Sequence, residues 1–150
     1  MYDLQELYQE VVMDHNRRPR NFRKLEGANR TAKGFNPFCG DEITLYLKVE
    51  DDTISDVGIQ AVGCAISKAS ASMMTESIKG KSKAEAEKLF GAFRHMVTRK
   101  PGEEIDAEAL GDLEMLGGVV AYPVRIKCAV LAWHTLHAAL NGVQEGVSTE

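Results

Sequence analysis

Cysteine is scarce in this chain. Only three of its 150 residues are cysteine, and no two of them form a Cys-x-x-Cys pair. The missing pairs argue against a zinc ribbon and against a thioredoxin-type redox site. An odd cysteine count is not typical of a disulfide framework, so we expect the chain to work in the reducing cytosol. Its length predicts one domain, residues 1–150, that buries a core without disulfides.

Long apolar runs and a strong excess of one charge are absent as well. No apolar run reaches the roughly 18 residues that span a bilayer, and the N-terminus lacks a secretory pattern. The formal net charge of −4 argues against nucleic acid as the main partner. There is no P-loop, no dinucleotide-binding fingerprint and no serine-hydrolase elbow. We therefore expect neither a membrane nor a nucleic acid as partner.

Two stretches alternate apolar and polar residues. They are residues 42–50 and 54–62, with the acidic turn residues Asp51 and Asp52 between them. Alternation is typical of strands with one buried face, so the pattern predicts an antiparallel hairpin. Residues 29–34 are a candidate for a short edge strand beside it.

Helical periodicity is present in four segments, residues 3–15, 64–79, 83–95 and 123–141. Asp3 is the expected N-cap of the first, and Val124 is expected on the inner face of the last together with Cys128. Residues 98–118 are irregular and acidic, which favours a solvated surface connection with one or two short helical turns within residues 107–116. We predict an α+β fold with a three-stranded antiparallel sheet and four or more helices packed on one face.

The three cysteines fall at positions that such a fold can bring together. Cys39 comes just before the predicted hairpin and Cys64 just after it, and an antiparallel hairpin returns its far end beside its start. Asp41, two residues after Cys39, projects to the same side of an extended chain. Cys128 lies in the second turn of the last helix, with Arg125 one turn before it.

Three thiols and one carboxylate suit a tetrahedral thiophilic cation such as zinc, or an iron–sulfur cluster. A thiol at a helix N-terminus, as predicted for Cys64, is favoured as the reactive thiolate. The alternative is that Cys64 and Cys128 are small buried hydrophobes, because free cysteine is often buried. The four histidines, His15, His95, His134 and His137, fit surface or capping positions better than a metal site.

Five basic residues lie between Asn16 and Lys24. A solvated loop is the simpler interpretation of this run, and a docking site for an acidic partner is the other.

Three blocks of the sequence closely resemble the IscU/SufU/NifU N-terminal family of iron–sulfur assembly proteins. They are residues 36–41 (Asn-Pro-Phe-Cys-Gly-Asp), residues 63–74 (Gly-Cys-Ala-Ile-Ser-Lys-Ala-Ser-Ala-Ser-Met-Met) and residues 123–129 (Pro-Val-Arg-Ile-Lys-Cys-Ala). The resemblance covers essentially the whole chain and implies a SufE/IscU-like fold. Within the family the chain is most similar to the SufU branch. It has that branch's extra segment, roughly residues 93–113, and it has Lys127 where IscU proteins carry a histidine.

The SufU resemblance implies a zinc ion held by Cys39, Asp41, Cys64 and Cys128. It also implies a sulfurtransferase that acts beside a pyridoxal-phosphate-dependent cysteine desulfurase and passes sulfur to a downstream iron–sulfur acceptor or scaffold. Cys39 would accept the persulfide sulfur, and Arg125 would steady the thiolates or the persulfide. One alternative is a scaffold that builds a transient [2Fe–2S] cluster on Cys39, Cys64 and Cys128. A third possibility is a structural zinc in a protein that only binds partners.

Overall fold

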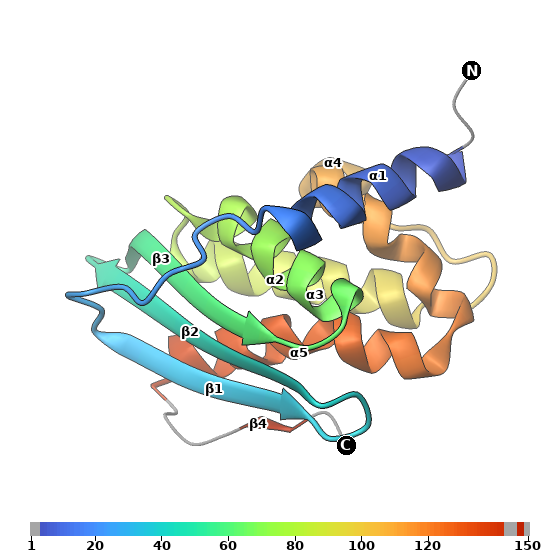
Figure 1. Ribbon diagram of the computed structural model, residues 1–150. Helices are drawn as coiled ribbons and strands as arrows, with labels where there is room; N and C mark the ends of the chain where they lie inside the picture. Colours follow the sequence, from blue (N-terminus) through green and yellow to red (C-terminus); the bar gives the residue numbers. More distant parts are fainter. Residues whose placement is uncertain (1–3, 143–146, 149–150) are drawn as a thin grey trace.

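The computed structural model describes residues 4–142 and 147–148 (Figure 1). Its elements are, in chain order, α1 (Leu4–Arg17), β1 (Arg30–Asn36), β2 (Asp41–Glu50), β3 (Thr53–Val62), α2 (Ala65–Ile78), α3 (Lys83–Thr98), α4 (Ala107–Leu110), the 3₁₀ helix η1 (Gly111–Ala121), α5 (Pro123–Leu140) and β4 (Val147–Ser148). The N-cap expected at Asp3 lies outside the described residues.

The sheet has the strand order β3-β2-β1-β4. The three long strands β1, β2 and β3 run antiparallel, which confirms the predicted three-stranded sheet, and β2 and β3 form the predicted hairpin. The strand expected at residues 29–34 continues to Asn36 and pairs on both sides, because the two-residue β4 lies parallel to its end. This extension places Asn36 opposite Asp41.

The helices are stacked on one face of the sheet (Figure 1). α2 and α5 contact the strands directly, and α1, α3 and η1 pack against those two helices. Alternate residues of β2, such as Ile43, Leu45 and Leu47, are fully buried on the face that α5 covers. On the helix side, the ring of Trp133 stacks on that of Phe93 with their centroids 4.7 Å apart. The predicted packing of helices on one face is thus confirmed.

A polar brace joins α2 to α5 inside this core. Ser70 of α2 donates a hydrogen bond from Oγ to the carbonyl oxygen of Ala129 at 2.6 Å, and its Oγ accepts one from Trp133 Nε1 at 3.2 Å. Buried polar groups must be paired, so these bonds fix the two helices in one register. α2 begins directly after Cys64 and α5 carries Cys128, so the brace also fixes those two thiols relative to each other.

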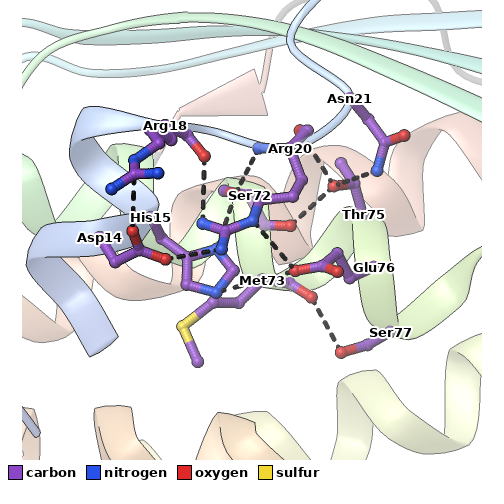
Figure 2. Close-up of polar contacts among 10 residues, drawn as sticks. All are labelled: Asp14, His15, Arg18, Arg20, Asn21, Ser72, Met73, Thr75, Glu76 and Ser77. Atoms are coloured by element: carbon purple, nitrogen blue, oxygen red, sulfur yellow. Dashed lines mark hydrogen bonds and ion pairs between the residues drawn. The ribbon is translucent and has the colours of Figure 1, made fainter. Parts of the chain in front are cut away.

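A second polar seam joins α1 to α2 (Figure 2). His15 Nδ1 lies 2.8 Å from Ser72 Oγ, which also accepts the backbone N–H of Arg20 at 2.8 Å. Arg20 Nη2 lies 2.6 Å from Asp14 Oδ2. The surface or capping position expected for His15 is therefore wrong, since its side chain is buried between the helices.

The segment after α3 also departs from expectation. Residues 98–118 were expected to form a solvated connection, but Leu110, Leu113 and Leu116 are buried in the main core, followed by Val119. The three-residue spacing of the leucines matches a 3₁₀ helix, in which side chains at i and i+3 lie above one another. The 3₁₀ helix packs against α1, α2, α3 and α5, and the acidic residues of the segment remain exposed.

None of the helices in the described part of the chain is long and apolar enough to cross a bilayer.

Candidate metal centre

Residues from three separate segments meet at one end of the sheet. The β1–β2 turn carries Cys39, β2 starts at Asp41, and the second turn of α5 carries Cys128. Cys39 Sγ lies 3.4 Å from Cys128 Sγ. The ligand atoms of Cys39, Asp41 and Cys128 all lie within 4.8 Å of one another, as expected for groups that can share one metal ion.

Cys64 joins this group through Asp41. The backbone N–H of Cys64 donates to Asp41 Oδ1 at 2.8 Å, and Cys64 Sγ lies 3.8 Å from Asp41 Oδ2. Cys64 is also the N-cap of α2, where its sulfur accepts the backbone N–H of Ser67 at 3.5 Å. The structure thus brings Cys39, Asp41 and Cys128 into one compact set and places Cys64 against its carboxylate.

The donor set and its spacing fit a small thiophilic cation. Two sulfurs bound to a tetrahedral zinc at about 2.3 Å stand roughly 3.8 Å apart. The two sulfurs of Cys39 and Cys128 are close to that spacing, and so are the Cys64 sulfur and the Asp41 oxygen. Cys39 and Cys64 remain partly exposed, whereas Asp41 and Cys128 are fully buried. A buried carboxylate beside three sulfurs is the kind of group that a bound cation would balance.

The electrostatics of the centre oppose charge on Cys128 when no cation is bound. Burial raises the pKa of the Cys128 thiol far above its usual range, and hydrogen bonding with Cys39 and Cys64 adds to the shift. The pKa of Arg125 is raised too, first by hydrogen bonding to Cys128 and then by attraction to Cys64 and the other thiols. Arg125 carries a permanent positive charge, and this charge lies near enough to the thiols to interact with them.

Asn36 is a residue of this centre to which the sequence analysis gave no role. Its side chain is fully buried, and its amide nitrogen lies 3.2 Å from Asp41 Oδ2 and 3.6 Å from Cys128 Sγ. Alternation along β1 could have found it, because Ala32, Gly34 and Asn36 share the inner face.

Exposed apolar side chains lie close in sequence to the cysteines of the centre. Each is within six residues of one of the cysteines: Phe38, Val62, Tyr122 and Val124, with exposed fractions of 58–69%. The inner-face position expected for Val124 is therefore wrong, because α5 begins beyond the edge of the core there. Lys127 lies with its Nζ 4.0 Å from the centre of the Phe38 ring, so its ammonium caps this rim.

A cavity of about 290 Å³ lies elsewhere, between α1, α2 and the α4–η1 segment. His15, Glu76 and Asp112 line its polar side, and Met73 and Leu113 line its apolar side. None of the predicted site residues lies in it.

Comparisons with known proteins agree with this geometry. The sequence model of one protein family, the NifU-like N-terminal domain, matches residues 7–129. The chain belongs to this family. It is 44% identical over 139 residues to the iron–sulfur cluster assembly scaffold protein IscU of Streptococcus pyogenes, an alignment that covers 92% of this chain and 85% of the relative. It is 43% identical over 144 residues to the zinc-dependent sulfurtransferase SufU of Bacillus subtilis, with 96% of both chains covered.

The fold agrees with a solved structure of the same family. A crystal structure from Fervidobacterium islandicum, described as a cluster assembly scaffold protein for the SUF system, superposes with a TM-score of 0.82. It is 39% identical and covers 91% of this chain and 98% of its own. This family member thus has the architecture that positions the sulfurs here, and the resemblance noted from the sequence is confirmed.

Proposed function

We propose that this protein serves iron–sulfur cluster assembly as a zinc-dependent sulfur carrier. In this proposal Cys39, Asp41, Cys64 and Cys128 hold zinc, and Cys39 accepts sulfur from the persulfide of a cysteine desulfurase. The observation that carries it is the convergence of Cys39, Asp41 and Cys128 within 4.8 Å, with Cys64 against the same carboxylate.

Lys127 supports the carrier function over the scaffold function. Its ammonium group offers no lone pair to a metal, and it lies over the Phe38 ring at 4.0 Å. A fifth donor next to Cys128 is therefore missing, which leaves a four-ligand set of the kind that zinc prefers. The similarity to a relative named zinc-dependent over nearly its whole length points the same way.

The transfer step exchanges one sulfur–sulfur bond for another. Zinc, when bound, would keep the thiols of the centre deprotonated at neutral pH. The Cys39 thiolate attacks the outer sulfur of the desulfurase persulfide, and a new S–S bond forms. The bond between that sulfur and the desulfurase cysteine breaks, and the desulfurase sulfur leaves as a thiolate with the electron pair. No external oxidant or reductant is required, and Arg125 offsets the charge of the new persulfide.

The apolar rim suits the approach of the donor protein. Exposed apolar patches mark protein contacts, and these side chains lie close in sequence to the cysteines that have to be reached. Burying Phe38, Val62, Tyr122 and Val124 under a partner would exclude water from the persulfide during transfer. The same rim serves a downstream acceptor of the sulfur, provided that the two partners bind in turn.

A scaffold for a [2Fe–2S] cluster is the second candidate function. It would use the sulfurs of Cys39, Cys64 and Cys128, and the observation that favours it is the 44% identity to a relative named as a scaffold. Protein purified in air separates the two functions. A colourless protein with about one zinc per chain supports the carrier, whereas a brown protein with stoichiometric iron and sulfide supports the scaffold.

Sulfur transfer itself is tested by the turnover of a cysteine desulfurase with and without this protein. We expect the unmodified protein to stimulate turnover and Cys39→Ala to lose the stimulation. Ser82→Ala, at the N-cap of α3 and far from the sulfurs, is the control and should stimulate normally. Equal stimulation by Cys39→Ala would refute the carrier function.

A further inference from the structure

Hydrogen-bond donors are unevenly distributed among the four groups of the centre. Cys64 Sγ accepts the N–H of Ser67, and Cys128 Sγ accepts the side-chain amide of Asn36. Asp41 accepts one donor on each oxygen, from Cys64 N–H on Oδ1 and from Asn36 on Oδ2. In the part of the chain that the structure describes, Cys39 Sγ receives no amide hydrogen bond, and its one hydrogen-bond partner is the thiol of Cys128.

Asn36 produces much of this asymmetry. It is the last residue of β1, and its fully buried side chain faces the same side of the sheet as Ala32. The amide oxygen accepts the N–H of Phe38 at 3.2 Å, which fixes the orientation of the amide and points its nitrogen at Asp41 and Cys128. A buried amide on an otherwise apolar face is costly unless its hydrogen bonds are made, so this arrangement is specific.

An amide hydrogen bond has two effects on a metal-binding thiolate or carboxylate. It fixes the direction of the donor atom, and it withdraws charge, which makes the atom a weaker nucleophile. The amide of Asn36 therefore holds both Asp41 and Cys128 in place and lowers their nucleophilicity. Cys39 keeps its full nucleophilicity and lies in a turn that is partly exposed.

We propose that Asn36 is a positioning residue that makes Cys39 the ligand that departs and reacts. Its amide would secure Asp41 and Cys128 as ligands of a bound ion, so that Cys39, which receives no amide hydrogen bond, would be the ligand free to react. This inference rests on the proposed function for its meaning, but its test requires no desulfurase.

The decisive variant is Asn36→Leu, which keeps the branched shape of the side chain and removes the donor. The probe is iodoacetamide, added in limiting amount to the zinc-loaded protein, with each alkylated cysteine identified by mass spectrometry. We expect the unmodified protein to be alkylated first at Cys39, and the preference for Cys39 over Cys128 and Cys64 to fall in the variant. We also expect zinc affinity, measured against a chelator, to fall by about 10–100-fold.

Asn29→Leu is the matched control. Asn29 lies at the other end of the same strand, where its amide bonds both backbone groups of Val49 far from the sulfurs. It should leave alkylation order and zinc affinity unchanged. Cobalt in place of zinc adds a spectroscopic readout, because its visible bands report ligand geometry and should shift for Asn36→Leu alone.

Two results would overturn the inference. One is an Asn36→Leu protein with the alkylation order, cobalt spectrum and zinc affinity of the unmodified protein. The other is an equal change in Asn29→Leu, which would show a general effect on the sheet. If Asn36→Leu does not fold, Asn36→Ser, which keeps a short donor, provides the same measurements with smaller expected shifts. A normal alkylation order together with a Cys39→Ala variant that still stimulates the desulfurase would instead refute the proposed function.

Discussion

Gly63 is the position at which a single methyl group should damage the centre most directly. Its φ is +144°, and a Cβ placed there would lie 2.8 Å from Asp41 Cα and 2.9 Å from Asp41 Cγ, and closer still to Oδ1. Backbone and a buried carboxylate cannot both withdraw from such a contact. Gly63→Ala must therefore push Asp41 away from the N–H of Cys64, the bond that ties β2 to the start of α2.

The expected loss of folding stability has two parts. A non-glycine residue at positive φ costs about 1–2 kcal/mol, whatever surrounds it. Loss of a buried hydrogen bond to a charged group costs about 1.5–3 kcal/mol more. We therefore expect Gly63→Ala to lower the free energy of unfolding by about 2.5–5 kcal/mol.

Gly80 provides the matched control, because it separates strain from collision. Its φ is +86°, and a Cβ there meets nothing within 4 Å. Gly80→Ala should therefore cost only the first part, about 1–2 kcal/mol. Urea unfolding of the metal-free proteins measures both values. Chelator competition should then show zinc affinity reduced about 10–100-fold for Gly63→Ala and unchanged for Gly80→Ala. Equal destabilisation of the two variants, with zinc affinity retained in both, would refute the reasoning.

Three further outcomes test the core and its polar contacts. Burial lowers the pKa of His15 in the folded protein. The contribution of His15 to stability is therefore complete above its unfolded pKa of about 6.5 and is lost as the pH falls. His15→Asn should make the free energy of unfolding depend less on pH between about pH 7 and 5. Ser70→Ala leaves the Trp133 N–H without its partner and should cost about 1–3 kcal/mol, with a change in tryptophan fluorescence, while Ser70→Thr tests whether the hydroxyl alone suffices. Ser82→Ala removes the capping box of α3 and should cost about 1 kcal/mol in thermal unfolding without any change in metal content.

The hairpin, and the return of Cys64 to the end of the sheet that holds Asp41, could be predicted because strict alternation fixes both register and direction. Residue 42 pairs with residue 62, so the segments that hold Asp41 and Cys64 must lie together. The position of Cys128 depended on where α5 packs, which periodicity does not give. The sequence made Cys128 a candidate, the family resemblance implied that it is a ligand, and its sulfur lies 3.4 Å from that of Cys39.

What could not be predicted depends on contacts between residues that no local pattern links. The burial of Leu113 and Leu116 follows from a 3₁₀ helix, whose three-residue period resembles neither a strand nor an α-helix over so short and glycine-rich a stretch. Asn36 was missed for another reason. The edge strand was predicted to end at residue 34, and an asparagine before a proline predicts a turn, so the alternation of β1 was not extended to Asn36.

The function that the centre can perform depends on whether a bound ion or the packed core holds its groups in place. In small zinc-dependent domains the ion supplies much of the folding free energy, so a ligand cannot leave without loosening the chain. Here Trp133, Phe93 and the strands form a buried core of their own, and Ser70 fixes the helix that follows Cys64 to the helix that carries Cys128. Packing therefore positions the elements that carry the sulfurs. The proposed carrier function would use this property, because Cys39 would have to leave the centre at each transfer while the other three groups keep their places.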